Sequence, residues 1–214
     1  MKIFFVFFAF FSVMALTGCA KKAPYDYTAF RESKPASILV LPAQNETTDI
    51  NAAHSFVSMV TQPLAESGYY VFPVAVVEET FKQNGLTNAT DIRSVSAAKL
   101  HSIFNADAAL YIDVTNYGTK YVLVDSVTTV TATAKLVDLR SGKQIWSGMA
   151  SASDNENNNT NSSLGILVAA VVKQISNKVT DEAHTIAGVA GTRLLTANTN
   201  GGILAGPRAK AVKQ

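Results

Sequence analysis

The sequence predicts an α/β domain with a mixed sheet, in which a parallel β-α-β-α-β first half precedes a C-terminal antiparallel β-meander and a long C-terminal helix. Three observations predict this fold class. Residues 37–42 are a continuous aliphatic run ended by proline, typical of a central strand covered on both faces. Residues 121–139 instead alternate apolar and polar side chains, as half-buried strands do. Residues 164–186 carry apolar side chains at helical spacing.

The first half of the chain alternates predicted strands with predicted helices. Apolar residues recur at helical spacing over 52–64, and Pro63 interrupts that pattern, so we expect a kink or a restart near Thr61. The other elements predicted here are a strand at 69–73, helices at 74–84 and 92–104, and a strand at 108–114. This order favours parallel pairing through right-handed crossovers.

The β-meander is predicted over residues 108–150. A loop at 116–120 is expected to lead from the strand at 108–114 into the alternating strand at 121–139. The residues at 138–143 are a turn signal, and 144–150 then return as the last strand. An asparagine-rich loop at 154–163 precedes the final helix.

The N-terminus carries the signature of an exported protein. Lys2 precedes an apolar run, Ile3–Leu16, that is shorter than the roughly 20 residues a membrane-spanning helix needs. The run ends in a stretch that resembles a lipobox, the signal for lipid attachment in bacteria. It consists of three residues for signal peptidase recognition and one cysteine: Leu16, Thr17, Gly18 and Cys19. We therefore expect cleavage before Cys19, a diacylglycerol group on its thiol and an acyl chain on its new amine. A short anchor helix and a free structural cysteine are the alternatives.

The anchor divides the chain and places it in the cell. Several acyl chains on one residue give stable membrane attachment, which one chain alone does not. In lipoproteins, Ala20 rather than aspartate after the cysteine implies transfer to the outer membrane, so we expect attachment there, on the periplasmic face. The expected segments are a signal peptide at 1–18, a tether at 19–35, a single domain at 36–190 and a flexible basic tail at 191–214.

Composition and motifs argue against several functions. Lysine and arginine total 18 against 16 acidic residues, so the sequence lacks the excess of positive charge that is typical of nucleic-acid-binding proteins. The histidines, His54, His101 and His184, lack co-ligands at metal spacing, and no catalytic motif occurs. We therefore expect no metal, no enzyme activity and no cofactor apart from the lipid on Cys19. An enzyme would need these histidines, or Asp107 and Asp113, to be brought together by folding.

Three groups of residues are candidates for contacts with other molecules. The aromatic residues Tyr25, Tyr27 and Phe30 can pack on the domain or on a neighbour. The nearly all-apolar segment that contains Gly165, Ile166 and Val172 is either a core helix or an exposed interaction patch. A ligand edge is expected at the carboxyl ends of the parallel strands, near Gln44, Asn45 and Pro73. The cations of the tail are either solvated or in contact with anionic headgroups or peptidoglycan.

A set of short motifs, in this order and spacing, resembles a family of bacterial lipoproteins typified by a conserved neisserial surface-antigen lipoprotein. The motifs are Leu39–Pro42 with Asn45, Pro63–Ala65 with Gly68–Pro73, Glu79–Phe81 with Asn84-Gly85, Ala106–Ala108, and Gly142 with Trp146–Gly148. The resemblance implies an outer-membrane lipoprotein with a domain similar to the N-terminal domain of TolB. It also implies that the protein occurs together with CsgG-like lipoproteins. The hairpin around Gly142 resembles one in CsgG-like and LpoB-like lipoproteins. It supplies no catalytic residues.

These observations together predict a non-enzymatic, outer-membrane-anchored lipoprotein that acts as a protein-interaction or assembly module in a cell-envelope or secretion complex. The expected partners are the membrane, other envelope lipoproteins with CsgG-like ones among the candidates, and a second copy of the chain. The alternative is a periplasmic binder of a small ligand or peptidoglycan at the carboxyl edge of the strands.

Overall fold

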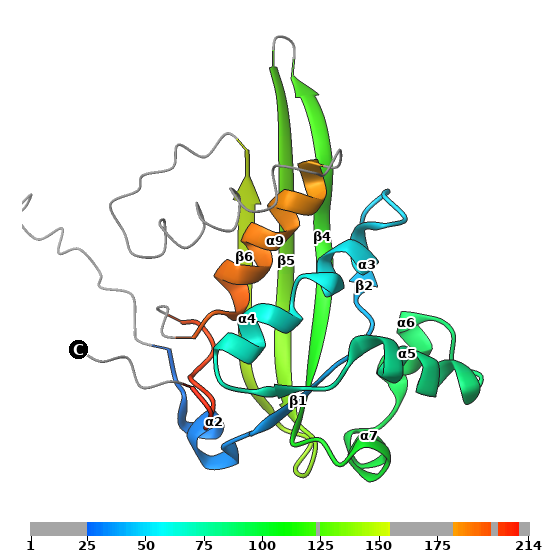
Figure 1. The fold of residues 1–214 in the computed structure, drawn as a ribbon, viewed down its shortest axis with the longest axis vertical. Helices are drawn as coiled ribbons and strands as arrows, with labels where there is room; N and C mark the ends of the chain where they lie inside the picture. The colour runs from blue at the N-terminus through cyan, green and yellow to red at the C-terminus, as the bar shows by residue number, and fades with distance from the viewer. Residues whose placement is uncertain (1–24, 123–124, 155–181, 198–200, 210–214) are drawn as a thin grey trace, which may run out of the picture.

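A computed structural model describes residues 25–122, 125–154, 182–197 and 201–209. Within these residues the protein forms a mixed sheet of order β3-β1-β4-β5-β6, and a short strand, β2 (Gln44–Asn45), pairs separately with β4. The sheet is parallel where β1 meets β3 and β4, and antiparallel from β4 to β6 (Figure 1). The predicted α/β fold class is confirmed.

The parallel half follows the predicted order with one difference among the helices. β1 (Ser37–Val40) lies between β3 (Tyr70–Val71) and β4 (Ala108–Val122), and all its apolar residues are buried. The connecting helices are α3 (Ala52–Ser58), α4 (Thr61–Glu66), α5 (Val74–Gln83), α6 (Ala89–Ser94) and α7 (Ala97–Phe104). The restart at Thr61 is confirmed. The single helix predicted at 92–104 is wrong, because the side chain of Ser96 accepts a hydrogen bond from the Lys99 amide and begins a second helix there.

The meander is longer than predicted because β4 does not end at residue 114. β5 (Asp125–Asp138) pairs with β4 as far as Val122, so the loop expected at 116–120 is instead strand. A bulge between Val114 and Asn116 shifts the alternation by one residue. Tyr117 therefore turns into the core, where it is 7% exposed. β6 (Gln144–Ser153) completes the sheet and extends beyond the predicted end at 150.

The C-terminal helix, α9 (Glu182–Leu195), contacts all three antiparallel strands as well as α3 and α4. Gly191 lies at the contact with α3 and its end; a Cβ added there would make ordinary contacts, 3.8 Å from the Met59 carbonyl oxygen. The prediction placed the helix at 164–186 and the domain boundary at 190, whereas α9 continues to Leu195. The predicted part before residue 182, with Gly165, Ile166 and Val172, lies outside the described residues.

The flexible tail expected at 191–214 is wrong over the residues the structure describes. Residues 191–195 belong to α9, and Ile203 is only 1% exposed. The Gly206 amide donates to the Ser67 carbonyl at 2.8 Å, and the Arg208 amide donates to the Gly68 carbonyl at 3.1 Å. The segment 201–209 is therefore a packed part of the domain.

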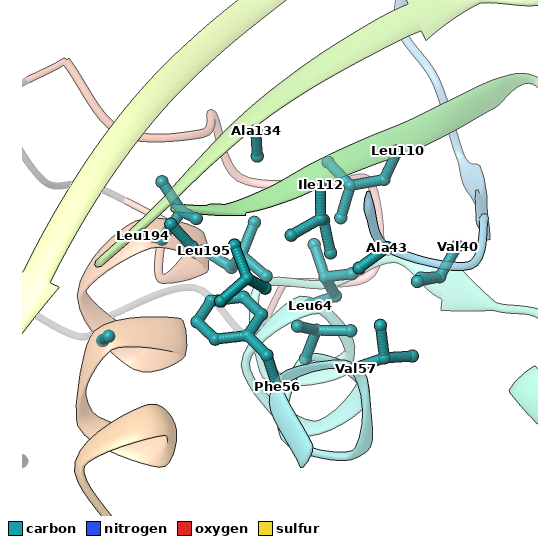
Figure 2. Close-up of a cluster of buried hydrophobic side chains, with 14 of the residues drawn as sticks. Val40, Ala43, Phe56, Val57, Leu64, Leu110, Ile112, Ala134, Leu194 and Leu195 are labelled. Atoms are coloured by element: carbon teal, nitrogen blue, oxygen red, sulfur yellow. The ribbon is translucent and has the colours of Figure 1, made fainter. Parts of the chain in front are cut away.

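The sheet separates two apolar clusters. One lies under α3, α4 and α9, where Phe56, Leu64 and Leu195 meet Leu110 and Ile112 of β4 (Figure 2). The other lies on the opposite face under α5, α6 and α7, with its own set of residues, among them Leu39, Leu41, Val77, Phe81 and Tyr111. β1 supplies both clusters from alternate residues, which explains its unbroken apolar sequence. None of the helices in the described part of the chain has both the length and the hydrophobicity that a membrane span requires.

Candidate functional site

The N-terminal segment of the described chain is pinned to the domain by its aromatic residues. The Tyr25 hydroxyl accepts a hydrogen bond from the Ser147 amide on β6 at 2.8 Å, and the Tyr27 hydroxyl donates to the Gly202 carbonyl at 2.6 Å. Phe30, on α2 (Thr28–Ser33), is 3% exposed in the core. Of the two interpretations left open by the sequence, the structure places all three residues on their own domain.

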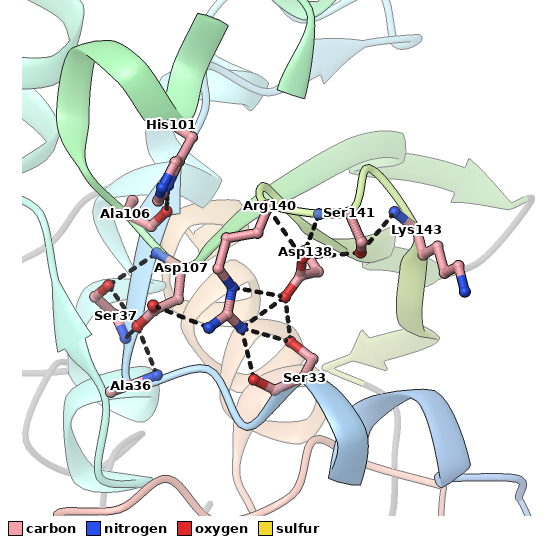
Figure 3. A network of polar contacts seen from close by, with 10 residues as sticks. All are labelled: Ser33, Ala36, Ser37, His101, Ala106, Asp107, Asp138, Arg140, Ser141 and Lys143. Carbon is pink, nitrogen blue, oxygen red and sulfur yellow. Dashed lines mark hydrogen bonds and ion pairs between the residues drawn. The ribbon is translucent and has the colours of Figure 1, made fainter. Parts of the chain in front are cut away.

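A buried carboxylate holds the end of α2 against the turn between β5 and β6 (Figure 3). The Asp138 side chain, only 4% exposed, accepts hydrogen bonds from the Ser33 hydroxyl at 2.6 Å and from Arg140 Nη2 at 2.8 Å. It also accepts from the Ser141 amide at 2.7 Å and the Ser141 hydroxyl at 2.9 Å. Burial acts to raise the pKa of Asp138, but these hydrogen bonds outweigh it and hold the pKa well below its usual range.

The neighbouring carboxylate, Asp107, binds the start of β1 in a similar way. Its Oδ2 accepts from the Ala36 amide at 2.9 Å, and from the Ser37 amide and the Ser37 hydroxyl, both at 3.0 Å. Arg140 Nη2 donates to the Ser33 carbonyl at 2.6 Å, and Arg140 Nη1 lies 3.9 Å from Asp107 Oδ1. Asp138 is engaged through both of its carboxylate oxygens, and Asp107 is engaged through Oδ2. The network therefore fixes where the N-terminal segment leaves the domain.

The three histidines belong to three different helices and have different surroundings. His101 Nδ1 bonds the Ala106 carbonyl at 2.8 Å, while His54 is exposed on α3. His184 Nδ1 lies 2.7 Å from the Ser55 hydroxyl, which also accepts from the Tyr117 hydroxyl at 2.8 Å. No group of three or more metal-ligating side chains occurs among the described residues.

The contact between Ser55 and His184 joins residues that are 129 positions apart, so no local sequence signal identifies it. It links α3 to α9, and Tyr117 adds β4. None of the cavities described below is lined by any of the three residues. This geometry ties three elements together.

A cavity of about 320 Å³ opens at the carboxyl end of β1. The chain leaves β1 toward α3 on one face and leaves β3 toward α5 on the opposite face, so this end is a topological switch point, where open α/β sheets bind ligands. The cavity has an apolar wall and three ionisable side chains. Its lining includes Pro42, Ala43, His54, Val57, Glu78, Lys82, Leu86 and Ile92.

The predicted ligand edge lies beside this cavity, but its three residues do not line it. Gln44 and Asn45 form β2 instead. The Asn45 side chain closes a local turn by accepting from the Thr47 amide at 2.9 Å and donating to the Asp49 carbonyl at 2.7 Å. Pro73 begins α5. The residues that face the cavity were missed because they come from helix faces whose orientation depends on tertiary packing.

The antiparallel part of the sheet has an exposed polar area on the face opposite α9, beyond the part that α5, α6 and α7 cover. Its strands present a polar surface with a shallow hollow of about 430 Å³, lined by Asp113, Thr133, Lys135, Gln144, Ser147 and Met149 among others. Met149 is 72% exposed, an unusual state for a large apolar side chain in a strand. Asp113 is held by an ion pair with Arg93 at 2.7 Å. We call this surface the open sheet face.

The comparisons with known proteins agree with the resemblance seen in the motifs. Residues 25–208 match the family described as "Putative lipoprotein GNA1162-like". The chain is 55% identical over 199 residues to "Putative lipoprotein NMB1124/NMB1162" of Neisseria meningitidis serogroup B (strain ATCC BAA-335 / MC58), across 92% of this chain and 93% of that protein.

One solved structure supports this family assignment. The crystal structure of lipoprotein GNA1162 from Neisseria meningitidis is 59% identical with a TM-score of 0.56, and the match covers 67% of this chain and 100% of that chain. A PelC dodecamer from Paraburkholderia phytofirmans is 17% identical with a TM-score of 0.42, covering 77% of this chain and 91% of that chain, a likeness too low to carry an argument. The chain therefore belongs to the GNA1162-like family of lipoproteins, which implies a membrane-anchored place in the cell envelope.

Proposed function

We propose that this chain is a non-enzymatic module, anchored by lipid at Cys19 to the periplasmic face of the outer membrane, that docks to other envelope proteins through its open sheet face. The observation that carries the proposal is the exposure of that face. Asp113, Lys135 and the hydroxyl-bearing Thr133 and Ser147 surround Met149 there, so polar groups surround an apolar centre. Such an arrangement matches the anatomy of protein interfaces.

The anchor supports the choice of partner. Tyr25, the first described residue, comes only six residues after Cys19. Six extended residues span at most about 21 Å. A domain attached to lipid through so short a connection stays at the membrane surface, and its partners are then proteins of the same compartment.

The chemistry of the described residues supports a binding role over catalysis. Asp138 and Oδ2 of Asp107 accept structural hydrogen bonds, and Asp113 is paired with Arg93. The contact between Ser55 and His184 lines none of the three cavities described. The polar groups that remain accessible lie on the open sheet face and in the cavity at β1, and both places fit a binding role.

Photo-crosslinking in intact cells tests the proposal. A photoreactive amino acid replaces Met149 on the open sheet face, and a matched control replaces Ser102, which is exposed on α7. We expect adducts with envelope proteins at position 149 and not at position 102; a CsgG-like lipoprotein and a second copy of the chain are both supporting partners. Equal labelling at the two positions, or no adduct at 149 in lipidated protein, contradicts docking through this face.

The cavity at β1 supports a second candidate, the binding of a small ligand or peptidoglycan fragment. Its volume of about 320 Å³ is at the lower end for ligand sites, and an apolar wall with few polar groups is their usual lining. In the described part of the chain, the side chains of Glu78, Lys82 and His54 form no hydrogen bond or ion pair with one another. An open carboxylate next to an open ammonium fits a ligand with both an amine and a carboxylate, as peptidoglycan stem peptides have.

Calorimetry with purified peptidoglycan fragments tests this candidate. We expect binding that is lost in Glu78→Gln and in Lys82→Gln. The matched controls are Glu79→Gln and Lys99→Gln, which change the same charges at exposed positions outside the cavity. Absence of binding to the unaltered protein, or equal loss in the controls, removes the candidate.

A further inference from the structure

The two ends of the described chain meet on one side of the domain. Tyr27 bonds Gly202, and a groove of about 450 Å³ runs between α2 and residues 204–207. Phe30 lies on one side of the groove, with Leu204 and Pro207 on the other. Figure 1 shows α2 next to the end segment and far from the free ends of β4 and β5. We call this region the anchored end.

The anchored end gathers cations. Arg31 and Lys34 are three residues apart, both are exposed, and both line the groove. Arg208 follows Pro207 and lies over the Tyr70 ring, 5.8 Å from its centre. Two acids share the segment, but Asp26 is engaged by the Thr28 amide and hydroxyl, and Glu32 does not line the groove.

The sequence extends this charge on both sides. Residues 20–35 and 201–214 contain seven lysines and arginines and only two acids, whereas the whole chain is nearly balanced at 18 against 16. The packing of 201–209 beside α2 is what brings Arg208 to the side of the domain where Arg31 and Lys34 line the groove. A cation near an anionic membrane surface strengthens binding roughly five-fold.

We propose that the anchored end is a membrane-facing surface, with its groove and with Arg31, Lys34 and Arg208 seated on the headgroups of anionic phospholipids. This proposal rests on the proposed lipid anchor at Cys19, whose short connection to Tyr25 reaches at most about 21 Å. The lipid holds the protein on the bilayer, and the cations set its orientation. The free ends of β4 and β5 then point away from the membrane.

Site-directed spin labelling of the full lipidated protein tests this orientation. Cys19 is the only cysteine of the chain, and its thiol is blocked by lipid, so an introduced cysteine carries the only label. One label is placed by Ala205→Cys in the groove, and the other by Lys120→Cys near the end of β4; both positions are exposed. The vesicles contain phosphatidylglycerol and a lipid that carries chelated nickel at its headgroup. We expect the chelated nickel to increase the spin relaxation rate of the label at position 205 several-fold more than that of the label at position 120.

Two charge variants with equal loss of charge separate a specific surface from general attraction. Arg31→Gln, Lys34→Gln and Arg208→Gln together remove three cations from the anchored end. The matched control removes three exposed cations elsewhere, through Lys82→Gln, Lys99→Gln and Lys135→Gln. In the first variant, we expect the ratio of domains whose anchored end contacts the membrane to domains whose anchored end does not to fall on the order of 100-fold. The difference in nickel-induced relaxation between the labels at positions 205 and 120 is then abolished. The control leaves the difference unchanged.

The outcomes distinguish this proposal from the proposed function. Equal relaxation at positions 205 and 120 in protein that carries acyl chains on Cys19 contradicts only the membrane-facing surface. The membrane-facing surface alone is also contradicted if the two charge variants have equal effects. The same holds if the difference in relaxation between the two labels is unchanged in vesicles of phosphatidylcholine alone. Protein without acyl chains on Cys19 contradicts both.

Discussion

Asp138 offers the sharpest test of how the N-terminal segment is fixed to the domain. In Asp138→Asn, the shape is kept and the charge is removed. The amide oxygen can still accept from the Ser141 amide, which bonds Oδ1 at 2.7 Å. The amide nitrogen, however, replaces the oxygen that accepts from the Ser33 hydroxyl at 2.6 Å and from Arg140 Nη2 at 2.8 Å. It places a donor against the Arg140 donors.

The cost follows from these two lost contacts. A hydrogen bond to a charged group contributes about 1.5–3 kcal/mol. The Arg140 side chain is 46% exposed, so water replaces much of that ion pair, and we take about 1 kcal/mol for it. The Ser33 contact adds about 1.5 kcal/mol, which gives a loss of about 2–3 kcal/mol in the free energy of unfolding. For a domain of this size that lowers the melting temperature by about 5–10 °C.

Urea denaturation as a function of pH measures both the size and the origin of this loss. The pKa of Asp138 is lower in the folded protein than the value of about 3.9 in the unfolded chain. Its contribution is therefore fully present above the unfolded pKa and is lost as the pH falls through the folded pKa. We expect the difference in the free energy of unfolding between the wild type and Asp138→Asn to be constant from roughly pH 5 to pH 8 and to shrink below about pH 4.

The exposed Glu46→Gln, which also removes one negative charge, serves as the control, since surface substitutions usually change stability by less than about 0.5 kcal/mol. A loss in Asp138→Asn no larger than in this control, or a difference that does not shrink in acid, refutes the assignment of Asp138 as the charged centre of the network.

Three further substitutions test the packing. Gly148→Ala places a Cβ 2.5 Å from Cζ2 of Trp146, which is 1% exposed, so we expect a loss of about 1–3 kcal/mol in urea denaturation. Tyr27→Phe removes the hydrogen bond to Gly202 and costs about 1 kcal/mol, and faster amide hydrogen exchange in 201–209 reports the loosened segment. Phe56→Ala empties a fully buried site and lowers stability by about 3–5 kcal/mol in thermal unfolding; a loss under about 1 kcal/mol contradicts its place in the core.

Much of the fold follows from local pattern. The run at 37–42 is apolar because β1 contributes to both clusters, and that property is visible in the sequence alone. The length of β4 was not predictable in this way. Asn116 and Gly118 are typical turn residues, yet pairing with β5 and the bulge after Val114 keep the chain extended through them. Here a tertiary contact overrides a local preference.

The candidate sites were harder to predict than the fold. Ser96 is a typical residue for the start of a helix, but the prediction did not use it to divide 92–104 into two helices. Ile203 and Leu204 lie between glycines, a pattern typical of a flexible tail, but contacts with Tyr27 and Tyr69 hold this segment in place. The contact between Ser55 and His184 and the face of α5 that lines the cavity depend on distant segments meeting, which no local pattern reports.

The attachment of lipid to Cys19 underlies the proposed function and the proposed orientation alike. Mass spectrometry of the N-terminal peptide, from protein extracted out of outer membranes, measures it most directly. We predict a chain that begins at Cys19 and carries the added mass of a diacylglycerol group and one further acyl chain, and that loses both in Cys19→Ala. A chain that begins at Met1, or a Cys19 with an unmodified thiol, would contradict the account.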